Sequence, residues 1–171
     1  MKSIFRTEFI DQSIYRIDEN TSKIIKCLDL LSEEEVWHKP NASANSIANL
    51  ILHLCGNIRQ YAVSSLNYTE DTRERDLEFT TNGGLNKENL LQELNQTVED
   101  AKETIKNLPE EEFLKIRSVQ GFNFSAVGII VHITEHYSYH TGQIALITKL
   151  IKNQDLGFYA GIDLNTKNKT T

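Results

Sequence analysis

Apolar residues recur every three or four positions along four long stretches of this 171-residue chain. That spacing gathers them on one face of an α-helix, because about 3.6 residues complete each turn. The stretches cover about 3–31, 46–67, 87–108 and 125–152, and the whole chain has only two prolines and eight glycines to interrupt them. Four such helices in one small domain predict an all-α fold, a four-helix bundle.

The lengths of the three connections indicate how these helices are ordered. The first and third connections are the shorter ones, which fits antiparallel neighbours. The middle connection, residues 68–86, is polar, contains a Gly-Gly pair and has no helical period. It is long enough to cross over the whole bundle, so we expect the second and third helices to run parallel in an up-down-down-up order.

Length and charge limit the classes of partner. One domain over residues 1–164 accounts for most of the chain, and the polar tail at 165–171 is expected to be disordered. The net charge is −6, and no dense basic cluster precedes the end of the chain, which argues against nucleic acid as a partner. No apolar run approaches the roughly 18 residues that span a membrane. We therefore expect a small-molecule substrate.

The cysteines and the N-terminus suggest a location. Cys27 and Cys55 form no CxxC pair, and they are expected to be small core residues in a reducing cytoplasm. The N-terminal segment carries charges where a signal peptide needs its apolar part.

Three of the five histidines lie four residues apart near the end of the chain, at His132, His136 and His140. The apolar stripe of that helix consists of Ala126, Ile130, Ile133, Tyr137, His140, Ile144, Ile147 and Ile151. At about 100° per residue, His140 lies roughly 20° from the centre of this stripe, His136 roughly 60° and His132 roughly 100°. We expect His140 and His136 to face the bundle interior and His132 to lie at the rim.

Two inward imidazoles one helical turn apart are well placed to chelate one divalent cation. Two core histidines that are merely hydrogen-bonded are the alternative interpretation. A third ligand would have to come from another helix, and His53 is the candidate. Asn49 and Asn57 lie one turn on either side of His53 and are candidate pocket residues, together with Gln143. No catalytic residue can be identified, because Cys55 lies about 200° around the helix from His53.

Two tempting motifs do not fit this pattern. His132, Glu135 and His136 match the HxxEH pattern of inverted zinc proteases, but Glu135 projects away from the core stripe. A di-iron bundle would need paired Glu-x-x-His motifs on two helices, and position 50, three residues before His53, is a leucine.

The segments "NSIANLILHLCGNIRQY" and "HYSYHTGQI" together strongly resemble the DinB-like superfamily, which includes the YfiT-type and bacillithiol-transferase proteins. The segments "WHKPNASANSIANLILHL" and "TRERDLEF", the latter with Arg73, Arg75, Glu78 and Phe79, resemble one uncharacterised branch of it. The likeness extends from about Trp37 to Lys149.

The resemblance implies a four-helix bundle that is commonly homodimeric. It also implies one divalent metal ion held by His53, His136 and His140, the last being the histidine of "HTGQ". Many relatives have arginine where this chain has Thr141, a difference expected to alter the helix surface rather than the ligands.

The chemistry of such a site leaves three functions open. A three-histidine site keeps coordination positions free for water or substrate, and it suits Zn²⁺, Ni²⁺ and Fe²⁺ alike. Characterised relatives are transferases that use a low-molecular-weight thiol such as bacillithiol or mycothiol, so a metal-dependent S-transferase is expected first. A metal-dependent hydrolase and a non-catalytic metal-binding or sensor bundle are the alternatives. Gly142, in a helix interior away from the core stripe, is consistent with a dimer contact or with simple tolerance.

Overall fold

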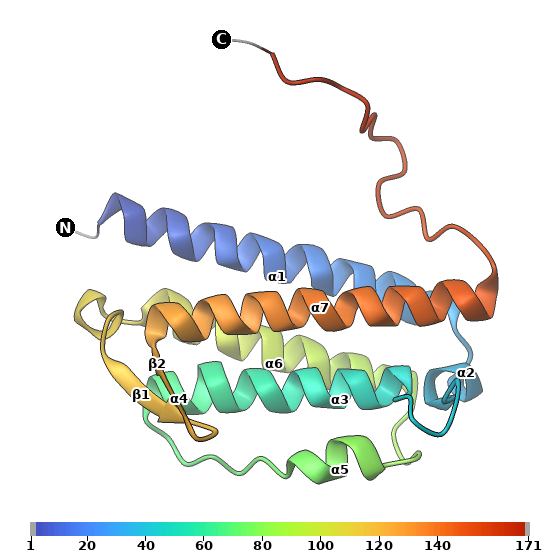
Figure 1. The fold of residues 1–171 in the computed structure, drawn as a ribbon, viewed down its shortest axis with the longest axis horizontal. Coiled ribbons are helices and arrows are strands. Elements are labelled where there is room, and N and C mark those ends of the chain that lie inside the picture. Colours follow the sequence, from blue (N-terminus) through green and yellow to red (C-terminus); the bar gives the residue numbers. More distant parts are fainter. Residues whose placement is uncertain (1–2, 170–171) are drawn as a thin grey trace.

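Four long helices carry the fold of the computed structural model, which describes residues 3–169 (Figure 1). They are α1 (Ile4–Leu30), α3 (Ile47–Ile58), α6 (Lys87–Asn107) and α7 (Ala126–Lys152). α3 continues without a break into η1 (Arg59–Ser64) and α4 (Ser65–Asn67). The all-α fold expected from the periodicity is confirmed.

The arrangement of the helices follows from which faces are apolar. α1 packs mainly against α7, and α3 packs against α6 and α7. Figure 1 shows α1 and α7 running in one direction and α3 and α6 in the opposite direction. The interior is filled largely by isoleucine and leucine side chains, among them Ile24, Ile51, Leu94 and Ile130. Each helix buries one apolar stripe. Polar side chains that also face inward are exceptions to this pattern and are therefore candidates for a functional site.

Capping residues fix where the helices begin. Ser32 and Glu35 form a capping box at the start of α2 (Glu33–Trp37). Ser46 accepts a hydrogen bond from the backbone N–H of Asn49 at the start of α3, and Ser125 caps α7 in the same way. These side chains satisfy backbone donors that the first helical turn leaves free.

Four short elements were not expected from the sequence. α5 (Arg75–Thr80) lies within the polar crossover and runs alongside α3 (Figure 1). At six residues it is too short to show a helical period. β1 (Ile116–Val119) pairs with β2 (Phe122–Ser125) as an antiparallel hairpin, and η2 (Glu110–Glu112) precedes it. The two residues of its turn, Gln120 and Gly121, both have positive φ, which matches the twist of the strands. Glutamine at the first position is a weak turn signal.

A π-helical segment interrupts the second long helix. η1 covers Arg59–Ser64, where the sequence pattern predicts uninterrupted α-helix. π-helical turns are rare and often lie at functional sites. Here the segment carries Gln60, which contacts the candidate site described below.

Residues 153–169, the described part of the segment after α7, contain neither helix nor strand. Leu156 is buried, and Lys26 Nζ donates to the carbonyl of Gly157, so the first part of the segment is attached to α1. Residues 160–169 are exposed, and the last two residues of the tail expected to be disordered lie outside the described range. Among the described residues, no helix is both long enough and apolar enough to cross a membrane.

Candidate metal centre

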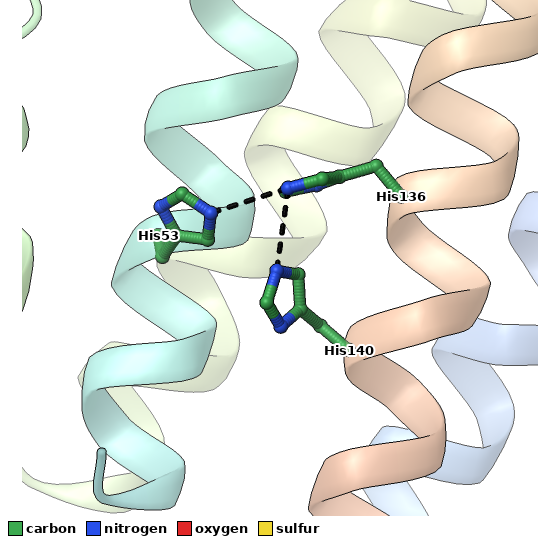
Figure 2. Close-up of side chains that lie close together, drawn as sticks. All are labelled: His53, His136 and His140. Carbon is green, nitrogen blue, oxygen red and sulfur yellow. Dashed lines mark hydrogen bonds between the residues drawn. The ribbon is translucent and has the colours of Figure 1, made fainter. Parts of the chain in front are cut away.

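Three histidines from two helices bring their Nε2 atoms together inside the bundle (Figure 2). His53 comes from the middle of α3, and His136 and His140 come from successive turns of α7. Nε2 of His136 lies 3.2 Å from Nε2 of His53 and 3.2 Å from Nε2 of His140. The three side chains could hold one metal ion, since one ligand atom from each lies within 4.8 Å of the others.

Helix geometry explains why these rings converge. His140 lies on the core stripe of α7 between the buried Tyr137 and Ile144, and His136 lies one turn earlier at the edge of that stripe. Side chains four residues apart on a helix lie one above the other. His53 is buried on the face of α3 that packs against α7. The inward placement of all three matches the sequence analysis.

Burial keeps the α7 imidazoles in the neutral form that metal ligands require. Burial, together with the neighbouring His140 and His53, lowers the pKa of His136 to about 3. Burial also lowers the pKa of His140, and this effect outweighs the opposing effect of the hydrogen bond with Gln143.

The hydrogen-bond partners of the Nδ1 atoms, which face away from the other histidines, determine which ring nitrogen of His53 and of His140 carries the proton. Nδ1 of His53 is 2.8 Å from Oε2 of Glu78, and Nδ1 of His140 is 2.7 Å from Oε1 of Gln143. An ionised carboxylate and an amide oxygen only accept hydrogen bonds, so both Nδ1 atoms carry a proton and donate it. In the neutral rings, Nε2 of His53 and Nε2 of His140 therefore carry no proton. Each of these atoms points its lone pair at Nε2 of His136.

The three Nε2 atoms consequently have one proton too few to form both hydrogen bonds between them. Nε2 of His136 can donate to only one of its two neighbours, which leaves one pair of facing lone pairs with no hydrogen between them. A divalent cation would accept all three lone pairs at once. In a tetrahedral site with metal–nitrogen distances of about 2.0–2.1 Å, two ligand nitrogens lie about 3.3 Å apart. Two of the three separations, at 3.2 Å, are close to this value, and all three ligand atoms lie within 4.8 Å of one another, so the residues fit such an ion.

Glu78 and Arg73 were not identified as site residues from the sequence, although both lie in the segment that carries the family resemblance. Arg73 donates from Nε to Oε1 of Glu78 at 2.7 Å and from Nη2 to Oε2 at 2.9 Å. Burial alone would raise the pKa of Glu78, but hydrogen bonds from Arg73 and His53 outweigh it and hold the pKa below its ordinary value. Glu78 is therefore a carboxylate at neutral pH.

The candidate pocket residues have different roles. Gln143 binds His140 directly. Asn57 lies one turn after His53, where its Nδ2 is 3.4 Å from Nε2 of His132, and its Oδ1 is buried without a hydrogen-bond partner among the described residues. Asn49 does not contact the three histidines. Its amide instead donates to the carbonyls of Glu78 and Thr81, at 2.9 and 2.8 Å, which attaches α5 to α3.

The remaining candidates lie outside the cluster. His132 packs against the rings of Tyr61 and Phe124, as expected for a residue at the rim. Cys55 is buried and its pKa is raised to about 12 by burial, so it is no ready nucleophile. A Cβ at Gly142 would meet nothing within 4 Å, so no contact within the described chain requires glycine there.

Comparisons with known proteins agree with this architecture. Residues 4–160 match a family described as "Protein of unknown function (DUF1572)". A conserved protein from Enterococcus faecalis has a similar structure at 15% identity, with a TM-score of 0.67 over 84% of this chain and 97% of that chain. The DinB-like protein YjoA from Bacillus subtilis is also 15% identical, with a TM-score of 0.66 over 86% of this chain and 96% of that chain.

A DinB-like protein from Bacillus cereus is 12% identical, with a TM-score of 0.66 over 84% of this chain and 90% of that chain. No curated protein matches the sequence significantly. At these identities the solved structures establish a shared fold, so the predicted resemblance to DinB-like proteins is confirmed at the level of the fold.

Proposed function

The chain belongs to the DUF1572 family and shares the DinB-like fold, and from this premise we propose that it is a metal-dependent enzyme that transfers a small thiol. Its divalent ion is held by Nε2 of His53, His136 and His140. The observation that carries the proposal is the missing proton among these three atoms. Hydrogen bonding leaves two lone pairs facing each other, whereas a cation would accept all three lone pairs.

The surrounding residues are consistent with a metal ion that keeps coordination positions free for a substrate. Three histidine ligands leave coordination positions for an exchangeable group, as catalytic zinc sites do. When bound, the ion would favour the thiolate form of a coordinating thiol at neutral pH. Gln143 and Glu78 hold the outer nitrogens of His140 and His53, which keeps both rings in the orientation that points Nε2 at the ion.

The proposed transfer is a substitution on an electrophile. The thiol loses its proton to solvent, its sulfur forms a bond to an electrophilic carbon, and the leaving group departs with its electron pair. The thiol is a low-molecular-weight cosubstrate of the bacillithiol or mycothiol kind. A reducing cytoplasm, expected from the unpaired Cys27 and Cys55, would keep such a thiol reduced.

One observation favours thiol transfer over hydrolysis. Hydrolysis gains from a free general base that takes a proton from water. Among residues 3–169, Glu78 is the only carboxylate bonded to the three histidines, and Arg73 and His53 occupy both of its oxygens. A thiol activated by the ion needs no such base. A non-catalytic sensor would use the same ligands but show no turnover.

A conjugation assay tests the proposed activity. The metal-loaded protein is mixed with bacillithiol, mycothiol, glutathione or coenzyme A and the generic electrophile monochlorobimane. We expect at least one thiol to react faster than the uncatalysed background, and the rate to disappear after chelation and in His136→Ala. His132→Ala, a change of the same kind one turn earlier, should retain the activity. Metal binding without acceleration of any thiol would refute the transferase.

We further propose that the protein is a homodimer. α7 exposes Tyr139, Leu146 and Leu150 on one side, where they are 59%, 58% and 70% exposed. Light scattering at micromolar concentration should give twice the 19.6 kDa mass of the chain, whereas the mass of one chain would contradict the dimer.

A further inference from the structure

We propose that Glu78, held in place by Arg73, is a positioning residue that selects Nε2 of His53 as its ligand atom. The part of this inference that concerns metal affinity rests on the proposed function. The part that concerns the proton of His53 does not, because it describes the protein without an ion.

The contacts around Glu78 leave its carboxylate one arrangement. Both oxygens are bonded to Arg73, and Oε2 also receives the Nδ1 proton of His53. The side chain of Glu78 is 9% exposed and that of Arg73 is 3% exposed. Arg73 uses its remaining Nη1 to donate to Oε1 of Gln60 at 2.8 Å. The guanidinium is thus held by η1, the π-helical segment that follows α3, and cannot turn away with the carboxylate.

Glu78 decides against the other tautomer of His53, which would be favoured by Arg73. Nη2 of Arg73 lies 3.2 Å from Nδ1 of His53, close enough to donate to that nitrogen if it were unprotonated. Such a bond would place the proton on Nε2 and remove the lone pair from the cluster. The carboxylate of Glu78 is nearer, at 2.8 Å, and a carboxylate can only accept, so Nδ1 keeps the proton.

The backbone of α3 is shaped to admit this carboxylate. Gly56 lies three residues after His53, and a Cβ built on it would lie 1.9 Å from Oε1 of Glu78 and 3.0 Å from Nε of Arg73. Glycine in a helix interior costs on the order of 1 kcal/mol relative to alanine. Here the missing side chain gives the carboxylate the space next to the helix that it needs to reach His53.

Contacts with α3 hold α5, the short helix that carries Glu78, in place. Asn49 binds the carbonyls of Glu78 and Thr81 from the first turn of α3. The ring of Phe79 packs against His53, with 4.8 Å between the ring centroids. The crossover therefore acts as a second support for His53, and the side chains of α3 and α7 alone do not set the orientation of this ring.

The tautomer of His53 is measured in the metal-free protein by long-range ¹H–¹⁵N correlation spectra of histidine-labelled samples. The His53 signals are assigned by their loss in His53→Gln. We expect the wild-type ring to be protonated at Nδ1 at pH 7.5. A ring protonated at Nε2 would overturn the proposal, whether or not the protein binds metal.

The affinity for Co²⁺ alone is then measured by spectroscopic titration of the full chain. Glu78→Gln keeps the shape but removes the charge, and we expect it to bind Co²⁺ about 10–100-fold more weakly, the usual effect of losing an outer partner of a ligand. Asp76→Asn removes the same charge from an exposed position on the same helix and should bind like the wild type.

The two proposals fail in different ways. A wild-type protein that binds no Co²⁺ would refute the metal site and leave the tautomer result to decide the role of Glu78. Equal Co²⁺ affinity of wild type and Glu78→Gln would leave the metal site standing and refute the positioning role.

Discussion

Replacing His53, His136 or His140 by alanine is expected to remove most of the bound metal from the purified protein. Each change deletes one of three lone pairs that point at one position. Four-ligand zinc sites bind with apparent free energies of about 10–16 kcal/mol, so the loss of one ligand should weaken binding on the order of 100-fold. Elemental analysis after dialysis against a weak chelator measures the change as metal per chain.

His132→Ala is the matched control for these variants. It removes the same side chain from the same helix, one turn before His136. The ring of His132 packs against Tyr61, Phe124 and His136, but His132 is not one of the three histidines whose ligand atoms converge. Its metal content should equal that of the wild type. Full metal occupancy in His140→Ala, or loss of metal only in His132→Ala, would show that the ligands have been assigned wrongly.

Gly56→Ala is expected to destabilise the protein by roughly 1–3 kcal/mol, although alanine is the better helix former. The added methyl group would occupy the space of the Glu78 carboxylate. Moving that carboxylate breaks buried hydrogen bonds to Arg73 and His53, each involving a charged group. Urea unfolding of the metal-free protein measures the change in the free energy of unfolding, and a Co²⁺ titration should show weaker binding.

Gly142→Ala provides the comparison, because it adds the same methyl group to a helix interior where nothing lies within 4 Å. We expect stability equal to the wild type or higher by up to about 1 kcal/mol, with unchanged Co²⁺ affinity. If Gly56→Ala behaved like Gly142→Ala, the close approach of Glu78 to α3 would be disproved.

The long helices and the inner histidines could be predicted because both depend on local periodicity. The stripe of α7 alone separates His140 and His136 from His132, since successive positions on a helix are rotated by a constant angle. His53 follows from being the remaining histidine in an apolar helix. In each case the residues that decide the outcome lie within a few turns of one another.

The support around His53 could not be predicted, because it depends on contacts between distant segments. Glu78 and Arg73 lie in a crossover with no helical period, and their positions are set by Asn49 and by the space at Gly56. The polar face of α3 suggested that Asn49 lines the site, but its amide binds the backbone of the crossover instead. A glycine in an apolar helix was the one local sign that another segment approaches closely there.

Anomalous diffraction from crystals grown with Zn²⁺ tests the metal site most directly. With data collected at the zinc absorption edge, we expect one strong peak about 2.0–2.1 Å from Nε2 of His53, His136 and His140. Nδ1 of His53 should remain bonded to Glu78. No peak within reach of these three nitrogens, in crystals that hold zinc elsewhere, would contradict the site and the function proposed from it.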